Sequence, residues 1–278
     1  MFHRPMKLLA TGSLLFAALL AGQAAVAQVV NSKHDLSSGS TSPNNASIKS
    51  TSTTEVCVFC HTPHGANSAA PLWNRSPPTA GTLATYTYYD KTTSGSMDSP
   101  NATSTTIGLQ STMCLSCHDG ATALNLLINS PGPGLSTVPT MGAVNMSSLF
   151  GSLGVDLSND HPVGVQYCGG VAAAPGVVPL GCVDKDFKLT SLIKNSGVAV
   201  TTFAAGAGTD KWWLDIGTVD GIRQKTDLPL YVNATNTVPT VQCATCHEPH
   251  TNNGTATMVS FLRTPNIASV ICTTCHSK

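Results

Sequence analysis

Hydrophobic residues are clustered at the start of the chain. An apolar run from Leu8 to Leu20 follows two basic residues, Arg4 and Lys7, and leads to the small residues Ala25-Val26-Ala27. A positive start, a short apolar run and a small-residue cleavage site are typical of a secretory signal peptide. The run is shorter than the roughly 20 apolar residues of a membrane span. We therefore expect residues 1–27 to be removed on export.

Beyond residue 27 the hydrophobic pattern is weak, and we find no second long apolar segment. Leu109 to Cys117 and Ala121 to Ile128 have the apolar spacing of short helices, and Thr85 to Tyr89 alternates weakly, as a strand does. Proline and glycine in 130–134, and the polar stretch 92–106, predict loops. The expected fold class is mostly irregular coil, with short α-helices around the chemical motifs and a few short strands, and with no integral membrane segment.

The composition suggests that side chains alone do not build the core. Charged residues are 10% and aromatic residues 5% of the 278 residues, and Ser, Thr, Gly, Asn and Pro fill most of the rest. Removing Arg4 and Lys7 from the 14 basic residues leaves 12 against 14 acidic ones, a formal charge of −2. A nucleic-acid partner usually needs a basic face, so none is expected. A cofactor is a natural source of the missing apolar bulk.

Eight of the ten cysteines lie in four C-x-x-C-H frames. The frames are Cys57-Val58-Phe59-Cys60-His61, Cys114-Leu115-Ser116-Cys117-His118, Cys243-Ala244-Thr245-Cys246-His247 and Cys272-Thr273-Thr274-Cys275-His276. C-x-x-C-H is the signature of covalent haem c attachment. One short turn presents two thiols to the two vinyl groups of a porphyrin, and the next residue can place its imidazole on the iron. The sequence therefore predicts four covalently bound haems, which would form the core.

Two other kinds of site use C-x-x-C pairs, namely zinc sites and dithiol redox centres. Neither needs a histidine directly after the second cysteine, and only 9 of the 278 residues are histidine. A fourfold repeat of the adjacent histidine favours haem over both alternatives.

The number of histidines matches the number of axial positions. Eight remain after residue 27, of which four are proximal ligands: His61, His118, His247 and His276. The other four are His34, His64, His161 and His250. Four haems need four more ligands, so the count predicts bis-histidine coordination with no open iron position. Solvated histidines are the alternative for His34 and His161, and methionine is the alternative sixth ligand.

His64 and His250 share the frame C-x-x-C-H-x-P-H, which restricts what they can bind. A histidine three residues after a proximal ligand is tethered to the same side of that haem, so it should ligate a different one. Three residues span at most about 10–11 Å and each Fe–N bond adds about 2 Å, so the two irons would lie within roughly 15 Å. The frame therefore predicts closely spaced haems.

The motifs divide the chain unequally. We expect an arm over 28–56, one haem pair over 57–128, an insertion over 129–240 and a second haem pair over 241–278. The insertion contains the two remaining cysteines, Cys168 and Cys182, which in an exported chain would form a disulfide. Trp212-Trp213 could stack on a porphyrin, but ordinary packing is the better interpretation.

These motifs resemble a known group of proteins. Lys33-His34-Asp35-Leu36-Ser37, the segment Cys57 to Gly65, His161-Pro162-Val163-Gly164 and the two later motifs are similar to multihaem cytochromes c with doubled CxxCH motifs. Within them, the haem count and low charge resemble extracellular tetrahaem cytochromes of the OmcE type. The resemblance implies bis-histidine haems, polymerisation into filaments, and one iron per subunit ligated by the neighbouring subunit. His34, near the mature terminus, is the expected travelling ligand.

The expected function is electron transfer, without catalysis. The leading hypothesis is an extracellular or cell-surface conduit made of copies of this chain, which passes electrons from other cytochromes to external acceptors. The alternatives are a monomeric periplasmic carrier and a multihaem reductase. Carriers usually rely on charged docking patches, and a reductase needs an open iron position. The low charge and the histidine count argue against each.

Overall fold

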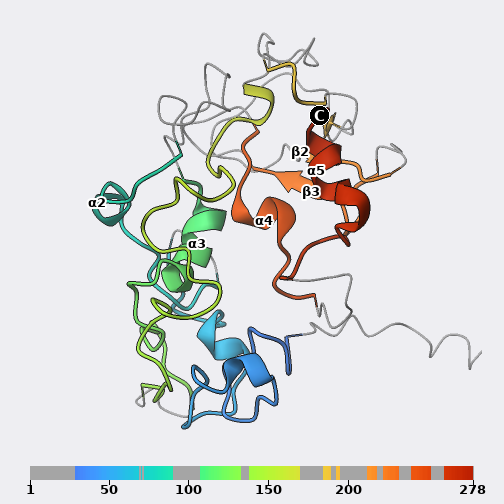
Figure 1. The fold of residues 1–278 in the computed structure, drawn as a ribbon. Coiled ribbons are helices and arrows are strands. Elements are labelled where there is room, and N and C mark those ends of the chain that lie inside the picture. The colour runs from blue at the N-terminus through green and yellow to red at the C-terminus, as the bar shows by residue number, and fades with distance from the viewer. Residues whose placement is uncertain are drawn as a thin grey trace, which may run out of the picture.

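The computed structural model describes residues 29–68, 70, 72–89, 107–132, 138–169, 184–188, 192–194, 212–217, 222–231, 239–251 and 260–277. Its helices are α2 (Ala80–Leu83), α3 (Leu109–His118), α4 (Cys243–Cys246) and α5 (Val270–Cys275), with the 3₁₀ turns η1 (Pro43–Asn45), η2 (Cys57–Phe59), η3 (Tyr167–Gly169) and η4 (Ile267–Ser269). Irregular backbone connects them (Figure 1). The expected signal peptide and the expected 92–106 loop lie outside the described residues.

A small antiparallel sheet packs beside the segment that contains the third and fourth C-x-x-C-H motifs. Strands β1 (Leu192–Lys194), β2 (Trp212–Leu214) and β3 (Leu228–Leu230) are arranged in that order, with Trp213 opposite Ile193 on one side and Pro229 on the other. Trp212 is buried in a core cluster that also contains Val241 and Ile271. The insertion is therefore packed against the segment that carries the third and fourth motifs, and Trp212 serves that packing.

The expected helix at Leu109–Cys117 is present as α3, and the side chain of Asp119 ends it. The Asp119 carboxylate accepts hydrogen bonds from the backbone N–H groups of Ala121 at 2.9 Å and Thr122 at 2.8 Å, and from the buried hydroxyl of Tyr86 at 2.9 Å. Burial acts to raise the pKa of Asp119, but these hydrogen bonds prevail and lower it. A side chain that takes the next N–H groups competes with further helical turns.

The expected helix at Ala121–Ile128 is wrong for the same reason. Its backbone groups bond to distant parts of the chain: Leu124 donates to Val144, and Ile128 donates to Asn74. The buried guanidinium of Arg75 donates to the carbonyls of Leu124 at 2.7 Å, Ser116 at 2.9 Å and Ala123 at 2.8 Å. Polar side chains thus hold residues 121–128 as an irregular turn that covers the end of α3.

The expected strand at Thr85–Tyr89 is also wrong. Only Thr87 pairs, in a single bridge with Asp156, and the backbone N–H of Thr85 turns back to Thr82. Weak alternation over five residues is too little evidence for a ladder when a helical turn precedes it directly.

Hydrogen bonds fix the amino-terminal arm. Buried Asp35 accepts from the backbone N–H of Asn31 at 2.7 Å and from the hydroxyl of Ser37 at 2.6 Å. The buried amide of Asn45 donates to the carbonyls of Ser32 at 3.0 Å and Asp35 at 2.7 Å. These bonds surround His34 and hold its backbone in one place.

The side chain of Gln242 joins α3 to α4. Its buried Oε1 accepts from the backbone N–H of Gly108 at 3.1 Å and from the hydroxyl of Ser111 at 2.6 Å. The Ser111 hydroxyl in turn accepts from the backbone N–H of Cys243 at 3.0 Å. A Cβ on Gly108 would lie 2.9 Å from the Gln242 side chain, so glycine permits this close approach. One polar contact therefore sets the spacing of the second and third motifs.

Two further features concern export and topology. Cys168 is disulfide-bonded, and its expected partner, Cys182, lies outside the described residues. Across the part of the chain that the structure describes, no helix is long and apolar enough to cross a membrane.

Replacing Gln242 with alanine should destabilise the fold. The substitution leaves the buried Gly108 N–H and Ser111 hydroxyl without an acceptor, at a cost of about 1–3 kcal/mol in the free energy of unfolding. Denaturant unfolding followed by circular dichroism would measure it. Gln110→Ala is the matched control, because the Gln110 side chain bonds to no described residue, and it should change stability by less than about 0.5 kcal/mol. Equal losses in both variants would contradict the assignment.

Candidate haem sites

Each C-x-x-C-H motif lies on a helical turn. The first starts with η2 and has Cys60 as its carboxyl-terminal cap, and the second occupies the last turns of α3. The third forms α4 and the fourth forms most of α5, with His247 and His276 as the caps that follow. The turn brings both thiols to one side, and the histidine leaves the helix at its end. This is the local geometry that attachment of one porphyrin requires.

The eight motif cysteines are free thiols. Burial, with smaller effects of neighbouring groups, raises the pKa of Cys60 to about 12, of Cys246 to about 11 and of Cys275 to about 12. Without a metal or cofactor, these three thiols are therefore protonated near neutral pH.

The four attachment turns are neighbours in chain order. Cys117 of the second motif contributes to the raised pKa of Cys60 in the first. The thiols of Cys114 and Cys243 hydrogen-bond to each other, which raises the pKa of Cys114 and lowers that of Cys243. The second motif thus lies between the first and the third.

The third motif is in turn next to the fourth. Cys272 contributes to the raised pKa of Cys246, and Cys246 contributes to that of Cys275. The attachment points therefore follow one another from the first motif to the fourth, which motif spacing alone does not reveal.

His61 and His250 face each other, although 189 positions separate them in the numbering. Their ring centres are 5.8 Å apart and their planes differ by 20°. Two nearly parallel rings at this separation are too far apart for face-to-face contact. The Nδ1 of His61 lies 3.3 Å from the carbonyl oxygen of Leu72, and because a carbonyl only accepts, Nδ1 carries the proton. Its Nε2 is left with a free lone pair.

His34 and His118 form a second opposed pair. Their ring centres are 6.1 Å apart and their planes differ by 79°. The Nδ1 of His118 donates to the Gly151 carbonyl at 2.6 Å, which again leaves Nε2 free. His34 stacks on Phe261 at 4.2 Å and hydrogen-bonds to the carbonyl of Pro249. Burial first, and then the neighbouring His118, lower the pKa of His34 to about 4, so its ring is neutral.

These separations fit a metal ion between the rings. Two Fe–N bonds of about 2 Å, taken from zinc–imidazole bonds, and about 1.1 Å from each nitrogen to its ring centre give about 6 Å. Both pairs match that value, and a neutral imidazole is the form that binds metal. Axial rings may have any angle between their planes, because both planes contain the axis. The donor set therefore fits the haem that the sequence predicts.

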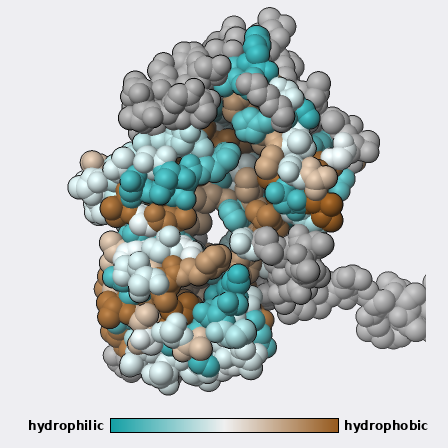
Figure 2. Space-filling view, viewed as in Figure 1, coloured by the Kyte–Doolittle hydropathy of each residue, from teal (hydrophilic) through white to brown (hydrophobic). Residues whose placement is uncertain are grey.

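The surroundings of His61 fit a porphyrin as well. A cavity of about 600 Å³ is bordered by Cys57, His61 and Pro63 among others. The indole of Trp73 lies 5.8 Å from the His61 ring, and its buried Nε1 has no partner among the described residues. A haem propionate is an acceptor of the kind that such a donor needs. Figure 2 shows the surface hollowed near the middle of the molecule, with hydrophobic residues beside the hollow.

His161 and His276 are a looser pair. Burial first, and then the electrostatic effect of His161, lower the pKa of His276. The ring of Phe187 lies 4.5 Å from that of His276, on the segment that forms a bridge with it. His161 is thus a neighbour of the fourth motif.

His247 and His64 are left over. The Nδ1 of His247 donates to the Ser260 carbonyl at 2.6 Å, which leaves its Nε2 free. No ring contact joins it to a second candidate ligand within the described residues, and the His64 ring likewise makes no contact there. His64 is exposed. Among the described residues neither has an opposed ring, although His247 lies near enough to His34 to help lower the pKa of that ring, and near enough to His118 to have its own pKa lowered.

The expectation that His34 reaches a neighbouring subunit does not fit this arrangement. The arm is held by Asp35 and Asn45, and His34 lies opposite His118 of its own chain. Proximity to the mature terminus suggested a mobile ligand, whereas the hydrogen bonds of the arm fix it.

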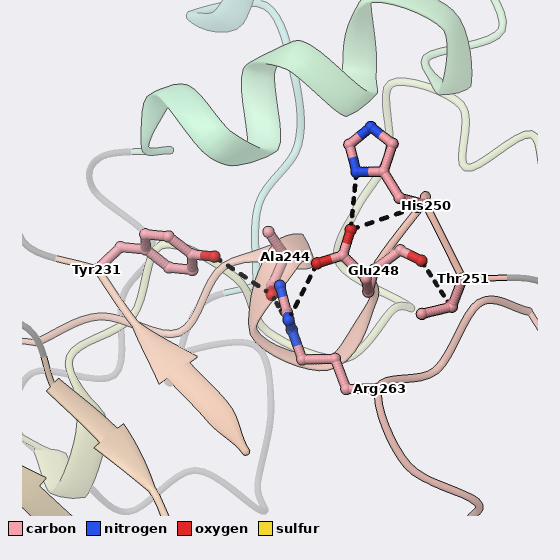
Figure 3. A network of polar contacts seen from close by, with 6 residues as sticks. All are labelled: Tyr231, Ala244, Glu248, His250, Thr251 and Arg263. Atoms are coloured by element: carbon pink, nitrogen blue, oxygen red, sulfur yellow. Dashed lines mark hydrogen bonds and ion pairs between the residues drawn. The ribbon is translucent and has the colours of Figure 1, made fainter. Parts of the chain in front are cut away.

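A charged network supports His250 (Figure 3). The Nδ1 of His250 lies 3.0 Å from Oε1 of Glu248, and Nη1 of Arg263 lies 3.2 Å from Oε2. The hydrogen bond from His250 comes first among the causes that lower the pKa of Glu248 to about 2, and the charge of Arg263 adds to it. The same hydrogen bond raises the pKa of His250.

Sequence reasoning missed Glu248, Arg263 and Arg75 as parts of the sites. Arg75 lies near Cys60 and Cys117, and its charge acts to lower the pKa of both thiols against the larger effect of burial. Arg75 is one of few charged residues in the chain, which is a signal in the sequence. Its partners are backbone carbonyls, so the sequence does not show what it binds. Glu248 occupies the variable position of the H-x-P-H frame, where the first copy has Thr62, so the motif itself did not single it out.

In comparisons of the sequence with known proteins, no family model matches the chain, and no curated protein matches it significantly.

The two opposed pairs should differ in their electron paramagnetic resonance (EPR) spectra. Nearly parallel imidazole planes, as at His61/His250, split the two iron orbitals that interact with the ligands and give a rhombic low-spin signal. Nearly perpendicular planes, as at His34/His118, leave those orbitals almost equal in energy and give a signal with one very large g-value. We expect both signals in the oxidised protein. Their simultaneous absence would contradict the ring angles.

Proposed function

We propose that this chain is an exported tetrahaem c-type cytochrome that transfers electrons and assembles with copies of itself into an extracellular filament. The motif cysteines, Cys57, Cys60, Cys114, Cys117, Cys243, Cys246, Cys272 and Cys275, would attach four haems. His61, His118, His247 and His276 would bind the irons on one side. The fold class of the sequence analysis, with haems as the core of a mostly irregular chain, is part of this proposal.

The observation that carries the proposal is the opposition of histidines from remote segments. His250 comes from the second haem pair and faces His61 of the first, and His34 comes from the arm and faces His118. Both ring-centre separations match the length of two iron–nitrogen bonds plus the distance from each nitrogen to its ring centre, with one iron between the rings. One metal ion between the rings accounts for the similar separation at both sites.

Such ligation favours electron transfer over catalysis. When bound, haem iron supplies a one-electron couple, and two imidazoles would occupy both axial positions. A ring that stays bound in both oxidation states leaves no position for substrate. The row of attachment turns, from Cys60 and Cys117 to Cys246 and Cys275, would place the haems in sequence, so electrons would pass between neighbours.

Self-assembly is supported by the two unpaired ligands. Among the described residues, His247 has no ring opposed to it in the manner of the two pairs, and the ring of exposed His64 makes no contact. His64 cannot reach the iron of its own motif because of the short H-x-P-H tether. We assign His64 of one copy to the haem that His247 holds in the next copy. Repetition of that contact would generate a polymer, because it joins two different surfaces of the chain.

A monomeric periplasmic carrier is the second candidate, and a multihaem reductase is the third. The carrier would share the haem sites but would give the His247 haem a different sixth ligand. The reductase would leave that position open for substrate. The low charge of the chain, 10% of residues, argues against a carrier that docks by charged patches.

Intact-mass measurement of the exported protein tests the cofactor. We expect the mass of the chain without residues 1–27 plus four haems. The double substitution Cys57→Ser with Cys60→Ser should remove one haem and leave three. An exported product that carries no added porphyrin mass would overturn the whole assignment.

Replacing His64 with alanine tests the assembly. The variant should keep four haems but remain a monomer by size-exclusion chromatography and negative-stain microscopy, because the contact between copies loses its iron–nitrogen bond. When reduced, each monomer should bind carbon monoxide at one haem. The matched control, His34→Ala, should open the His118 haem within the chain and still assemble.

The outcomes separate the three candidates. Normal filaments from His64→Ala would exclude His64 as the crossing ligand. A wild-type protein that is monomeric at every concentration indicates a carrier if it does not bind carbon monoxide, and a reductase if one haem binds it promptly.

A further inference from the structure

One proposed ligand differs from the others in what holds its ring. Five of them place a ring nitrogen against a backbone carbonyl: His34, His61, His118, His161 and His247. The Nδ1 of His250 instead lies 3.0 Å from a carboxylate oxygen of Glu248. In Figure 3 the other ring nitrogen points away from this network. The carboxylate thus acts on His250 from the side opposite to the proposed iron.

Glu248 is held in place as a charged group. Its second oxygen lies 3.2 Å from Arg263, whose side chain is 7% exposed, while that of Glu248 is 19% exposed. Arg263 is itself anchored, because its Nε donates to the carbonyl of Ala244 at 3.0 Å on α4. The carbonyl of Glu248 accepts from the Thr251 hydroxyl at 2.8 Å, which fixes the turn around Pro249. The contact with His250 is therefore built from the third motif's own helix and turn.

A carboxylate on Nδ1–H makes an imidazole more electron-rich. Such outer partners raise ligand basicity, and a more basic axial ligand together with a nearby negative charge favours the oxidised, more positive iron. Arg263 draws charge away from Glu248 and so opposes the effect. A neutral carbonyl on Nδ1–H, as at His118 and His247, acts in the same direction but more weakly.

The chain contains its own contrast. The first H-x-P-H frame has Thr62 where the second has Glu248. The Thr62 hydroxyl donates to the backbone carbonyl of His64 at 2.9 Å and makes no bond to the His64 ring. The carboxylate is thus a property of one copy of the motif and is not required by the turn.

We infer that Glu248 is a positioning residue that lowers the reduction potential of the haem held between His61 and His250, and that Arg263 limits how far it is lowered. The inference rests on the proposed function, since it requires haem between those rings. It goes further in naming a residue that makes one of the four haems a weaker electron acceptor than its two histidines alone would make it.

The test is a redox titration of haem-loaded Glu248→Gln, followed by visible absorption and by EPR of the rhombic signal assigned to His61/His250. Glutamine keeps the size and an acceptor oxygen but removes the charge. We expect that haem's reduced-to-oxidised ratio at a fixed potential to rise about tenfold, equivalent to about 59 mV for one electron. The g-values of its signal should also change. The other three haems should keep their potentials, and Arg263→Met should shift the same haem in the opposite direction.

Glu55→Gln is the matched control. Glu55 is the only other glutamate in the chain. It borders the cavity beside His61 but accepts no hydrogen bond from a ligand ring. Its oxygen instead accepts from the backbone N–H of Gly132 at 2.8 Å. The substitution removes the same charge near the same haem but leaves the hydrogen bond of the His250 ring intact. The g-values should therefore stay unchanged.

Two results would overturn the inference: no selective shift in Glu248→Gln, or equal shifts in both glutamate variants with unchanged g-values. Each variant is first checked by mass for four haems. Absence of haem would contradict the proposed function. Four haems with an unchanged reduction potential would contradict this inference alone.

Discussion

Two imidazoles that face each other across a gap are the constraint on which the rest of this structure depends. An iron ion between the rings, as proposed, would account for this arrangement, since an imidazole binds metal in its neutral form. His61 and His250 show it, and His34 and His118 repeat it at another ring angle. The backbone that carries these rings is mostly irregular, and its order comes from polar side chains that bind backbone groups, such as Asp35, Asn45 and Arg75.

The opposed histidines also explain why the chain is not divided into two independent pairs of motifs. His250 leaves the second pair to face His61 of the first, and the carbonyl of Pro249 next to it holds His34. Gln242 adds a polar contact between α3 and α4. Segments that are far apart in sequence therefore share each site. The two H-x-P-H frames have diverged in use, since the ring of His250 faces His61 and bonds to Glu248, whereas the ring of His64 contacts no other described residue.

Short local motifs of this chain can be identified from the sequence more readily than the course of its backbone. Adjacency within C-x-x-C-H is local, so a motif can be identified without knowledge of the fold, and the helix at Leu109 was predicted within one residue of α3. Residues 121–128 were misassigned because the Asp119 carboxylate takes the N–H groups that a helix would use. The partner of each histidine was not predictable, because it depends on contacts such as His34 with Phe261, which join positions far apart in the sequence.

The contact between Cys114 and Cys243 has a consequence for how the protein matures. Two free thiols within hydrogen-bond distance can oxidise to a disulfide in the compartments to which exported chains are sent. Such a bond would consume one sulfur from each of two attachment turns and lock α3 to α4 before either turn was complete. If the proposed haems are attached at these turns, their attachment would therefore have to precede the docking of α3 against α4.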